Sequence, residues 1–456
     1  MIVLKFGGTS VQSAEAIRNV VSIVRSRQGK RLVVVSALAG VTNKLVDIIK
    51  NLNNENLSEA LKIADELLER HINTAEELHL KSDVNDFIIS KMSELKNLLN
   101  ALDVLGEISP KSKDMILSYG ELLSSVLIFE SFQTTVRKVN FVDIRSILKT
   151  DSNYNEANVN FRETKKNAEN IINSMFEDND IIITQGFIAS NLQGFTTTLG
   201  RGGSDYSAST LASVLKAEKL EIWTDVDGIL TSDPKIVKDA LLIRELSYTE
   251  ASELAFFGAK VLHPKTIYPA IKDEIPVWVL NTFNPDKSGT KILSKAVSKK
   301  MIKAIAFRKG IIVINISSNR MLGAYGFLST VFDIFRKYET SVDLVTTSEV
   351  SISLTIDDSK NLDLIVKELK KFSSIEIQKK QAIISAIGEG IKNTSGIASR
   401  FFNVLKGVNI TMVSLGASEV NLSIVLSEKD LENALKLLHS EFFANIKSDN
   451  VFQKLS

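Results

Sequence analysis

Two glycine-rich segments carry the charged side chains that could bind an anion. In the first, Lys5 lies at the end of an apolar run and is followed by Gly7 and Gly8. Backbone amides at a glycine turn and the positive end of a helix bind phosphate, and the Lys5 ammonium could reach its outer oxygens. The order differs from the Walker loop, in which the lysine follows the glycines. A phosphate loop and a structural turn between strand and helix therefore both remain open.

The second glycine-rich segment runs from Thr198 to Asp205 and precedes a predicted helix. A guanidinium between glycines at a helix start suits two-point binding of a carboxylate, so Arg201 is a candidate ligand-binding residue. Ser204 and Asp205 are residue types that cap helices, and this structural role is an equal alternative for both.

Other polar residues are ambiguous when they are taken alone. Thr224 and Asp225 follow a predicted strand, and Lys235 ends a nearby polar segment. The Asp-Gly and Asp-Pro pairs of this region favour simple turns. Lys260, taken by itself, is typical of a surface charge.

Glu121 lies in a predicted helix, opposite its apolar face. Periodicity alone predicts that Glu121, Ser118 and Ser125 form a solvent-exposed face. The four histidines lack metal-ligand spacing, and the absence of cysteine excludes disulfides, thiolate metal sites and a cysteine nucleophile. We therefore predict no protein metal site.

Short apolar runs alternate with helical patterns through the first 300 residues or so. The runs begin at Ile2, Leu32, Ile181 and Leu220, and small or polar residues follow each of them. This alternation predicts a parallel sheet covered on both faces, with ligands bound beyond the carboxyl ends of the strands. Residues 44–135 read as a helical insertion, and residues 285–300 read as a linker.

The last part of the chain repeats itself. Residues 348–354 match residues 418–424, and Gly326 opens a helical pattern just as Gly396 does, 70 positions later. Each copy reads as strand, glycine-led helix, two strands and a final helix, which predicts two tandem ferredoxin-like modules. Such a pair suggests regulation, and an inert dimerisation module is nearly as good an interpretation.

Composition limits the possible partners. The 456 residues contain 55 Lys and Arg against 54 Asp and Glu, a net charge of +1 that gives no bulk attraction to nucleic acid or anionic membranes. The longest apolar run is half the ~20 residues that span a membrane, and the start is not typical of a signal peptide. We expect a cytoplasmic protein without nucleic-acid or membrane partners.

Six segments together closely resemble the aspartate kinase family over essentially the whole chain. They are residues 5–11, 36–43, 118–121, 184–187, 196–206 and 257–264. The resemblance implies an α/β amino-acid-kinase fold, a mainly parallel sheet sandwiched by helices, at residues 1–295. Two ferredoxin-like α+β ACT domains would follow at residues 300–380 and 381–456, the first commonly inserted within the second.

The resemblance also implies a reaction. The γ-phosphoryl group of ATP would pass to the side-chain carboxylate of L-aspartate, giving 4-phospho-L-aspartate in the first step of lysine, threonine and methionine biosynthesis. An aspartate side chain with a pKa near ~3.9 is already an anion and needs no general base. Catalysis would then consist of positioning and electrostatic stabilisation.

By the same resemblance, individual residues acquire roles. Lys5 would neutralise charge on the transferring group and Asp205 would orient Lys5, while the substrate would be bound by Thr42, Glu121 and Arg201. The nucleotide would be held by Lys5, Gly7, Gly8, Ser36, Thr224, Asp225, Lys235 and Lys260. Leu230 and Lys235 differ from the aromatic residue and the arginine common at these positions, and Mg²⁺ would arrive bound to ATP.

The ACT resemblance implies an allosteric amino-acid site, with L-lysine as the expected effector. Amides at the Gly326 helix start could bind its carboxylate, and Asp343 and Glu349 could bind its ammonium groups. The residues expected at this site are Met321, Gly326, Phe327, Leu328, Ser341, Asp343, Ser348 and Glu349. A homodimer or a dimer of dimers through the ACT domains is also expected.

Two alternatives deserve a test. Another kinase of this fold could act on glutamate, acetylglutamate or a nucleotide, but the ACT pair and residues 118–121 disfavour it. A non-catalytic amino-acid sensor is disfavoured because Lys5, Glu121, Arg201 and Asp205 occur together. Fusion to a homoserine dehydrogenase is not expected, since no dinucleotide-binding fingerprint follows the ACT pair.

Overall fold

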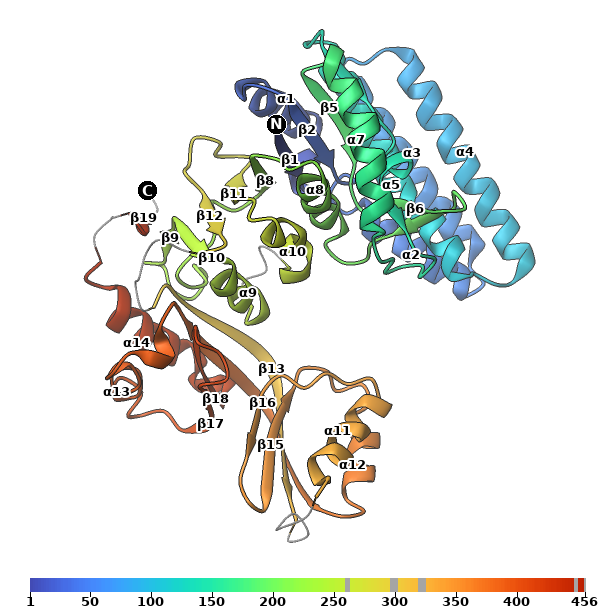
Figure 1. Ribbon diagram of the computed structural model, residues 1–456. Helices are drawn as coiled ribbons and strands as arrows, with labels where there is room; N and C mark the ends of the chain where they lie inside the picture. The colour runs from blue at the N-terminus through green and yellow to red at the C-terminus, as the bar shows by residue number, and fades with distance from the viewer. Residues whose placement is uncertain (259–262, 296–301, 319–324, 447–449, 455–456) are drawn as a thin grey trace. The chain divides into compact units, whose positions relative to one another are not determined.

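The computed structural model describes residues 1–258, 263–295, 302–318, 325–446 and 450–454. Contacts divide the chain into two units, drawn in Figure 1. The first comprises residues 1–229 and 261–295, and the second comprises residues 230–260 and 296–456. Residues 230–260 therefore make their contacts mainly with the C-terminal part of the chain.

A mainly parallel sheet forms the centre of the first unit. The strands that belong to this unit lie in the order β12-β11-β8-β1-β2-β5-β3, and among them only β12 runs antiparallel to its neighbour. They are β1 (Ile2–Phe6), β2 (Arg31–Val35), β3 (Val139–Phe141), β5 (Ile181–Gln185), β8 (Lys219–Thr224), β11 (Val277–Asn281) and β12 (Thr290–Leu293). The predicted parallel sheet is confirmed, whereas the predicted linker at 285–300 is wrong at 290–293 because β12 pairs there with β11.

Helices cover this sheet, and a small three-stranded sheet, β4-β6-β7, adjoins it. The helices are α1 (Ala14–Ser26), α2 (Val41–Asn53), α3 (Leu57–Glu77), α4 (Ser82–Leu105), α5 (Pro110–Gln133), α6 (Ile144–Ile147), α7 (Phe161–Asp178), α8 (Gly203–Val214) and α10 (Pro264–Lys272), with a 3₁₀ turn, η1 (Thr9–Val11). The small strands are β4 (Lys149–Thr150), β6 (Ile188–Asn191) and β7 (Thr196–Thr198). Helices α2 to α5 confirm the predicted helical insertion (Figure 1).

Helix α5 is a core helix, and more than half of its residues are buried. By length and composition it is the one described helix that could span a membrane, but 67% of its most apolar window is buried inside the protein. Burial on all sides is typical of a central helix in a globular unit. Its polar residues Ser118, Glu121 and Ser125 are buried as well, so the predicted solvent-exposed face is wrong.

The second unit contains a six-stranded antiparallel sheet in the order β14-β15-β13-β16-β18-β17. Its strands are β13 (Ala304–Ser317), β14 (Val345–Thr347), β15 (Ser351–Ile356), β16 (Ser374–Ile387), β17 (Ile410–Leu415) and β18 (Asn421–Ser427). The other elements are β9 (Leu241–Ile243), β10 (Glu245–Ser247), α9 (Tyr248–Phe256), α11 (Phe327–Lys337), α12 (Leu362–Leu369), η3 (Ile391–Asn393), α13 (Ile397–Asn403), η4 (Glu428–Asp430), α14 (Leu431–Phe443) and β19 (Phe452–Lys454).

The two long strands β13 and β16 are shared between two ferredoxin-like modules. Residues 311–317 of β13 pair with residues 374–381 of β16, next to β15 and β14. Residues 304–308 of β13 pair with residues 383–387, next to β18 and β17. One strand of the second module thus precedes the whole first module in sequence, which is the expected insertion.

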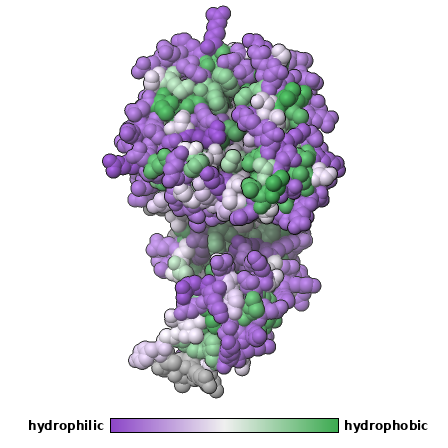
Figure 2. Space-filling view, turned by 90° about the vertical axis from the view of Figure 1, so that its right-hand side faces the viewer, coloured by the Kyte–Doolittle hydropathy of each residue, from purple (hydrophilic) through white to green (hydrophobic). Residues whose placement is uncertain are grey.

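The internal repeat corresponds to equivalent positions in these modules. Gly326 precedes α11 with φ 80°, and Gly396 precedes α13 with φ 81°. Both glycines adopt the left-handed conformation that a residue with a side chain rarely takes, which explains why glycine recurs there. On the face drawn in Figure 2, hydrophobic surface occurs as separate patches among hydrophilic side chains.

Candidate active site

A cavity of about 640 Å³ opens in the first unit at the carboxyl ends of β1 and β2. The N-terminus of α8 and the middle of α5 complete its wall. Seven residues that the sequence singled out line it: Lys5, Gly8, Ser36, Thr42, Glu121, Arg201 and Asp205. Ligand sites of parallel sheets lie at this edge, so the cavity is the candidate active site.

Lys5 and Asp205 form an ion pair inside the cavity. The Lys5 Nζ lies 2.6 Å from the Asp205 Oδ1, and the two side chains are only 11% and 15% exposed. Asp205 lies in the first turn of α8, but the N-cap residue is Gly202, and no side chain caps this helix end. The capping alternative for Ser204 and Asp205 is therefore wrong, and the Asp205 carboxylate instead fixes the ammonium of Lys5.

Two of the glycines allow close packing of the backbone at the cavity. A Cβ on Gly8 would lie 3.0 Å from the carbonyl oxygen of Ala37, and a Cβ on Gly202 would lie 2.6 Å from Thr266. Gly202 also has a φ of 72°, which favours glycine. A larger residue at either position would move a wall of the site.

Glu121 is a buried carboxyl group on the wall formed by α5. Its Oε1 accepts a hydrogen bond of 3.2 Å from the amide of Ala37, while its Oε2 is buried without a hydrogen-bond partner among the described residues. Burial raises the pKa of Glu121 to about 8, although the Ala37 amide and the positive charge of Lys5 oppose that rise. A buried carboxyl with one free oxygen beside a cavity is suited to binding an ammonium group.

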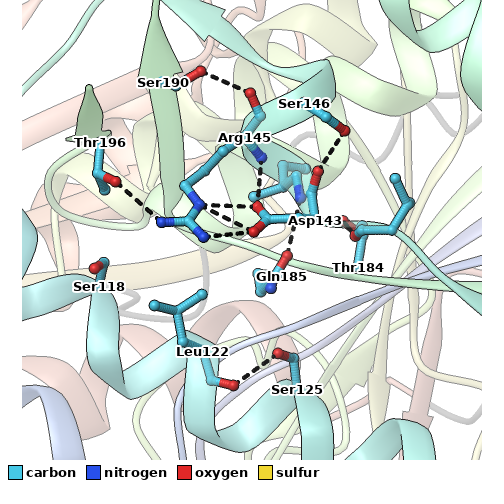
Figure 3. Close-up of polar contacts among 12 residues, drawn as sticks. Ser118, Leu122, Ser125, Asp143, Arg145, Ser146, Thr184, Gln185, Ser190 and Thr196 are labelled. Atoms are coloured by element: carbon cyan, nitrogen blue, oxygen red, sulfur yellow. Dashed lines mark hydrogen bonds and ion pairs between the residues drawn. The ribbon is translucent and has the colours of Figure 1, made fainter. Parts of the chain in front are cut away.

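Two hydrogen bonds join the end of β5 to the segment at the start of α6, as Figure 3 shows. The side-chain oxygen of Gln185 accepts from the amide of Ile144 at 3.0 Å, and the Thr184 hydroxyl donates to the carbonyl of Val142 at 2.8 Å. These bonds explain the polar residues of this predicted motif, because they satisfy backbone groups at a buried strand end.

Comparison with known proteins agrees with this geometry. The sequence matches the amino acid kinase family over residues 1–281 and an ACT domain over residues 384–442. It is 36% identical to lysine-sensitive aspartokinase 3 of Escherichia coli over 97% of this chain and 99% of that protein. The chain belongs to the aspartokinases. It is also 37% identical to the chloroplastic aspartokinase 1 of Arabidopsis thaliana, over 97% of this chain and 80% of that one.

Solved structures extend the likeness to the fold of this aspartokinase. E. coli aspartokinase III in complex with aspartate and ADP matches with a TM-score of 0.84 and 35% identity, over 97% of this chain and all of that one. The same enzyme in complex with lysine and aspartate also matches with a TM-score of 0.84. The predicted fold class and the class of ATP-dependent phosphotransferase are thereby confirmed.

Some expected nucleotide ligands of this aspartokinase do not line the cavity. Gly7, Thr224 and Asp225 lie outside the lining, and the Thr224 hydroxyl donates to the Asp225 carboxylate at 3.1 Å. Lys235 belongs to the second unit, where its amide donates to Asp233 in a local turn. Lys260 lies outside the described residues. The nucleotide roles of these five residues stay predictions.

The cavity is also lined by residues for which no role was predicted. Asn43 and Thr198 lie within segments that resemble the family, so their neighbours could have indicated them. Asn155 lies in an irregular segment between β4 and α7, where no motif marked it. Leu117 comes from the apolar pattern of α5, which indicated a core residue only.

The predicted effector site lies in the second unit and contains an arginine that the sequence did not indicate. Asp343 is 4% exposed in its side chain, and its Oδ1 lies 2.9 Å from Nη1 of Arg308, which also pairs with Asp357 at 2.8 Å. The Oδ2 of Asp343 is buried without a hydrogen-bond partner among the described residues. Burial raises the pKa of Asp343, and Arg308 opposes this rise.

Most of the other expected effector residues are exposed, and one lies outside the described residues. Gly326, Leu328, Ser341, Ser348 and Glu349 are exposed, and Phe327 is half-buried. Met321 lies outside the described residues. The assignment of all these residues to an effector site stays a prediction.

Proposed function

We propose that this aspartokinase phosphorylates L-aspartate within the cavity that holds Lys5, Glu121, Arg201 and Asp205. A carboxylate oxygen of aspartate attacks the γ-phosphorus of ATP as the bond to the ADP oxygen breaks, giving 4-phospho-L-aspartate and ADP. The proposal is carried by one observation, the convergence of an ammonium, a guanidinium and a buried carboxyl on one cavity. It is supported by the similarity to an aspartokinase solved with aspartate and ADP.

The chemistry asks for charge neutralisation rather than proton transfer. The acceptor is already ionised at neutral pH, so the main barrier is repulsion between two anions. Lys5, held at 2.6 Å by Asp205, supplies a fixed positive charge for the transferring group. A preorganised charge in a partly dehydrated site acts more strongly than the same charge in water.

Recognition of the acceptor is assigned to the opposite charges of Arg201 and Glu121. The Arg201 guanidinium suits the α-carboxylate of aspartate, and the free Oε2 of Glu121 suits its α-ammonium. Thr42, at the start of α2, lines the same cavity and helps to place the substrate. This arrangement requires Glu121 to be ionised when the amino acid is bound.

The phosphate groups are assigned to the glycine side of the cavity. Gly8 packs closely against Ala37 and lines the cavity beside Ser36, and a glycine turn between a strand and a helix is suited to a phosphate. Mg²⁺ is proposed to enter bound to ATP, as is usual for this ion. Within the described ranges, no group of three or more His, Cys, Asp or Glu side chains could hold a metal.

Regulation is assigned to the ACT pair, with L-lysine as the effector that inhibits the enzyme. The support is the paired but incompletely satisfied carboxylate of Asp343 and the glycine-led start of α11. A relative of this chain is named lysine-sensitive, and its structure with lysine and aspartate is described as the T-state. Inhibition requires lysine to bind a less active conformation more tightly than the active one.

Assembly through the ACT modules into a homodimer or a dimer of dimers is also proposed. The edge strands β14 and β17 of the six-stranded sheet carry exposed Val345, Val413 and Leu415. Exposed apolar residues on edge strands are suited to pairing with another copy. Sedimentation analysis of the full chain tests this point.

The domain limits 1–295, 300–380 and 381–456 and a cytoplasmic location stay predictions.

An acceptor screen tests the proposed activity. ADP formation is measured with ATP and, in separate reactions, L-aspartate, L-glutamate, N-acetylglutamate and a nucleoside monophosphate. We expect turnover with L-aspartate and little with the other acceptors. Equal turnover with glutamate would favour another kinase of this fold, and no turnover with any acceptor would favour a sensor.

A further inference from the structure

Asp114 is a buried carboxylate that belongs to no predicted site and yet contacts the wall of the active-site cavity. It lies on α5, two turns before Glu121, and it is fully buried. Seven residues correspond to about 10.5 Å along a helix and to the same face. One face of α5 thus presents Glu121 and Leu117 to the cavity, and Asp114 to two segments that line it.

Asp114 accepts hydrogen bonds from two separate segments of chain. Its Oδ2 accepts from the amide of Thr198 at 3.0 Å, and its Oδ1 accepts from the hydroxyl of Thr198 at 2.7 Å. The amide of Asn155 lies 3.1 Å from Oδ1 and 3.0 Å from Oδ2. Burial raises the pKa of the Asp114 carboxyl, and these hydrogen bonds oppose that rise.

The two segments that Asp114 joins form part of the cavity. Asn155 and Thr198 both line it, and Thr198 begins the loop that carries Arg201 into the site. The segments also pack against each other, because a Cβ on Gly200 would lie 3.2 Å from the carbonyl oxygen of Asn155. Asn155 has a φ of 73°, an unusual conformation that its hydrogen bond to Asp114 stabilises.

The hydroxyl group of each of the three threonines of β7 has a hydrogen-bond partner. Only the threonine that is bonded to Asp114 lines the cavity. Thr196 accepts from Nη1 of Arg145 at 3.2 Å, a contact that Figure 3 shows beside the ion pair of Arg145 and Asp143. The Thr197 hydroxyl lies 2.7 Å from that of Thr150. Of the three threonines, only Thr198 lines the cavity.

We propose that Asp114 is a positioning residue for acceptor binding. It holds the loop from Thr198 to Arg201 in the position from which Arg201 binds the substrate carboxylate. It acts through the loop and does not touch the substrate. The proposal extends the proposed function, because it relies on Arg201 binding the acceptor. Three donors face the Asp114 carboxylate and no acceptor does, so an amide, with a single acceptor oxygen, cannot satisfy them.

The test is the Asp114→Asn variant of the full-length enzyme, with kcat and the KM of both substrates measured. Small displacements of a positioned group cost up to about 10²-fold, so we expect the KM of aspartate to rise by about tenfold or more. The KM of ATP should change less than about twofold. The control is Thr197→Val, which removes a buried hydroxyl pair from the same strand without reaching the cavity, and it should leave both KM values near those of the wild type.

A double variant separates positioning from a general structural role. If Asp114 acts through Arg201, the KM of aspartate for Asp114→Asn with Arg201→Ala should nearly equal that for Arg201→Ala alone. Effects that multiply in full, or equal increases in the KM of both substrates, would overturn the proposal. Should Asp114→Asn fail to fold, Thr198→Val removes one donor alone, and it should raise the KM of aspartate selectively by several-fold.

Failure of the proposed function would look different. Arg201→Ala would then leave the KM of aspartate unchanged, whatever the effect of Asp114→Asn. In that case a selective effect of Asp114→Asn on aspartate would still support positioning of the wall at Thr198 and Asn155. The absence of any selective effect would overturn that as well.

Discussion

Two cation–carboxylate pairs lie at the two predicted ligand sites of this aspartokinase. They differ in which group, the cation or the carboxylate, is proposed to contact the ligand. In the kinase cavity, Lys5 and Asp205 are both nearly buried, and Asp205 holds the ammonium that is proposed to act on the substrate. In the ACT pair, Asp343 is 4% exposed and Arg308 is 30% exposed. There the carboxylate is the proposed ligand of the effector, and the arginine already occupies one of its oxygens.

The difference has a consequence for function. A preformed pair keeps a catalytic charge in place, so Asp205 assists Lys5. At the predicted effector site the carboxylate of Asp343 is already paired, so we expect Arg308 to compete with an incoming ammonium group. The guanidinium of Arg308 also lies 5.4 Å from the ring of Phe256 at the end of α9.

The largest expected effect comes from removing the catalytic cation. Lys5→Ala should lower kcat by about 10³-fold, with a much smaller rise in the KM of aspartate, because the ammonium acts on charge that develops during transfer. Steady-state kinetics with ATP and L-aspartate measure this, and Lys30→Ala, at an exposed lysine, is the matched control. A change confined to KM would mean that Lys5 only binds the ground state.

Glu121→Gln sharpens the assignment of the acceptor pocket. Loss of the ionised carboxylate should raise the KM of aspartate by about tenfold to 10²-fold and leave ATP binding near that of the wild type. Glu130→Gln, on the same helix, makes the same charge change elsewhere and should have no effect. Equal losses in affinity for both substrates would instead indicate misfolding or a nucleotide role.

Asp343→Ala tests whether the regulatory carboxylate binds lysine. Removal of a charge-assisted contact of about 1.5–3 kcal/mol should raise the inhibitory concentration of lysine by at least about tenfold and leave the uninhibited rate nearly unchanged. Inhibition curves for wild type, Asp343→Ala and the exposed-site control Asp358→Ala provide the measurement. Strong inhibition by threonine with none by millimolar lysine would refute the choice of effector.

Acceptor binding should also depend on pH through Glu121. Because burial raises its pKa to about 8, the carboxyl is mostly neutral at pH 7 in the free enzyme, and it ionises as the pH rises. The KM of aspartate should therefore fall several-fold between pH 7 and pH 8.5, and this dependence should vanish in Glu121→Gln. A KM that rises over this range in the wild type would show that the neutral carboxyl binds the acceptor.

Arg308→Gln should act in the opposite direction to Asp343→Ala, and with the smallest magnitude. Without the resident guanidinium, the Asp343 carboxylate is free for an ammonium group, so the inhibitory concentration of lysine should fall several-fold. Lys309→Gln changes the same charge at the neighbouring exposed position and is the control. An increased inhibitory concentration would mean that Arg308 orders the site instead of competing for it.

The sequence predicted the features that arise from local patterns. Alternating apolar runs predicted the parallel strands, and glycine-rich ends predicted the cavity residues Lys5, Gly8 and Arg201. The repeat at an offset of 70 predicted paired modules. Gly326 and Gly396 recur in it since both positions require the same left-handed conformation.

The sequence did not predict features that depend on packing between distant segments. Periodicity placed Glu121 in solvent because it cannot show that the polar side of α5, with Ser118, Glu121 and Ser125, is buried as well. Arg308 lies in the middle of β13, and Asp114 acquires its role from Thr198 and Asn155, which lie 84 and 41 residues away. The contacts of residues 230–260 with the second unit also depend on tertiary structure alone.

Phosphorylation of L-aspartate with the help of Lys5 is tested most directly by a competition between acceptors. Wild-type enzyme receives ATP with equal concentrations of L-aspartate and L-glutamate in the presence of hydroxylamine, and the trapped acyl hydroxamates are identified by mass spectrometry. We expect the β-hydroxamate of aspartate as the dominant product, formed only with ATP and almost lost in Lys5→Ala. A dominant glutamate product, or undiminished aspartate product in Lys5→Ala, would contradict this expectation.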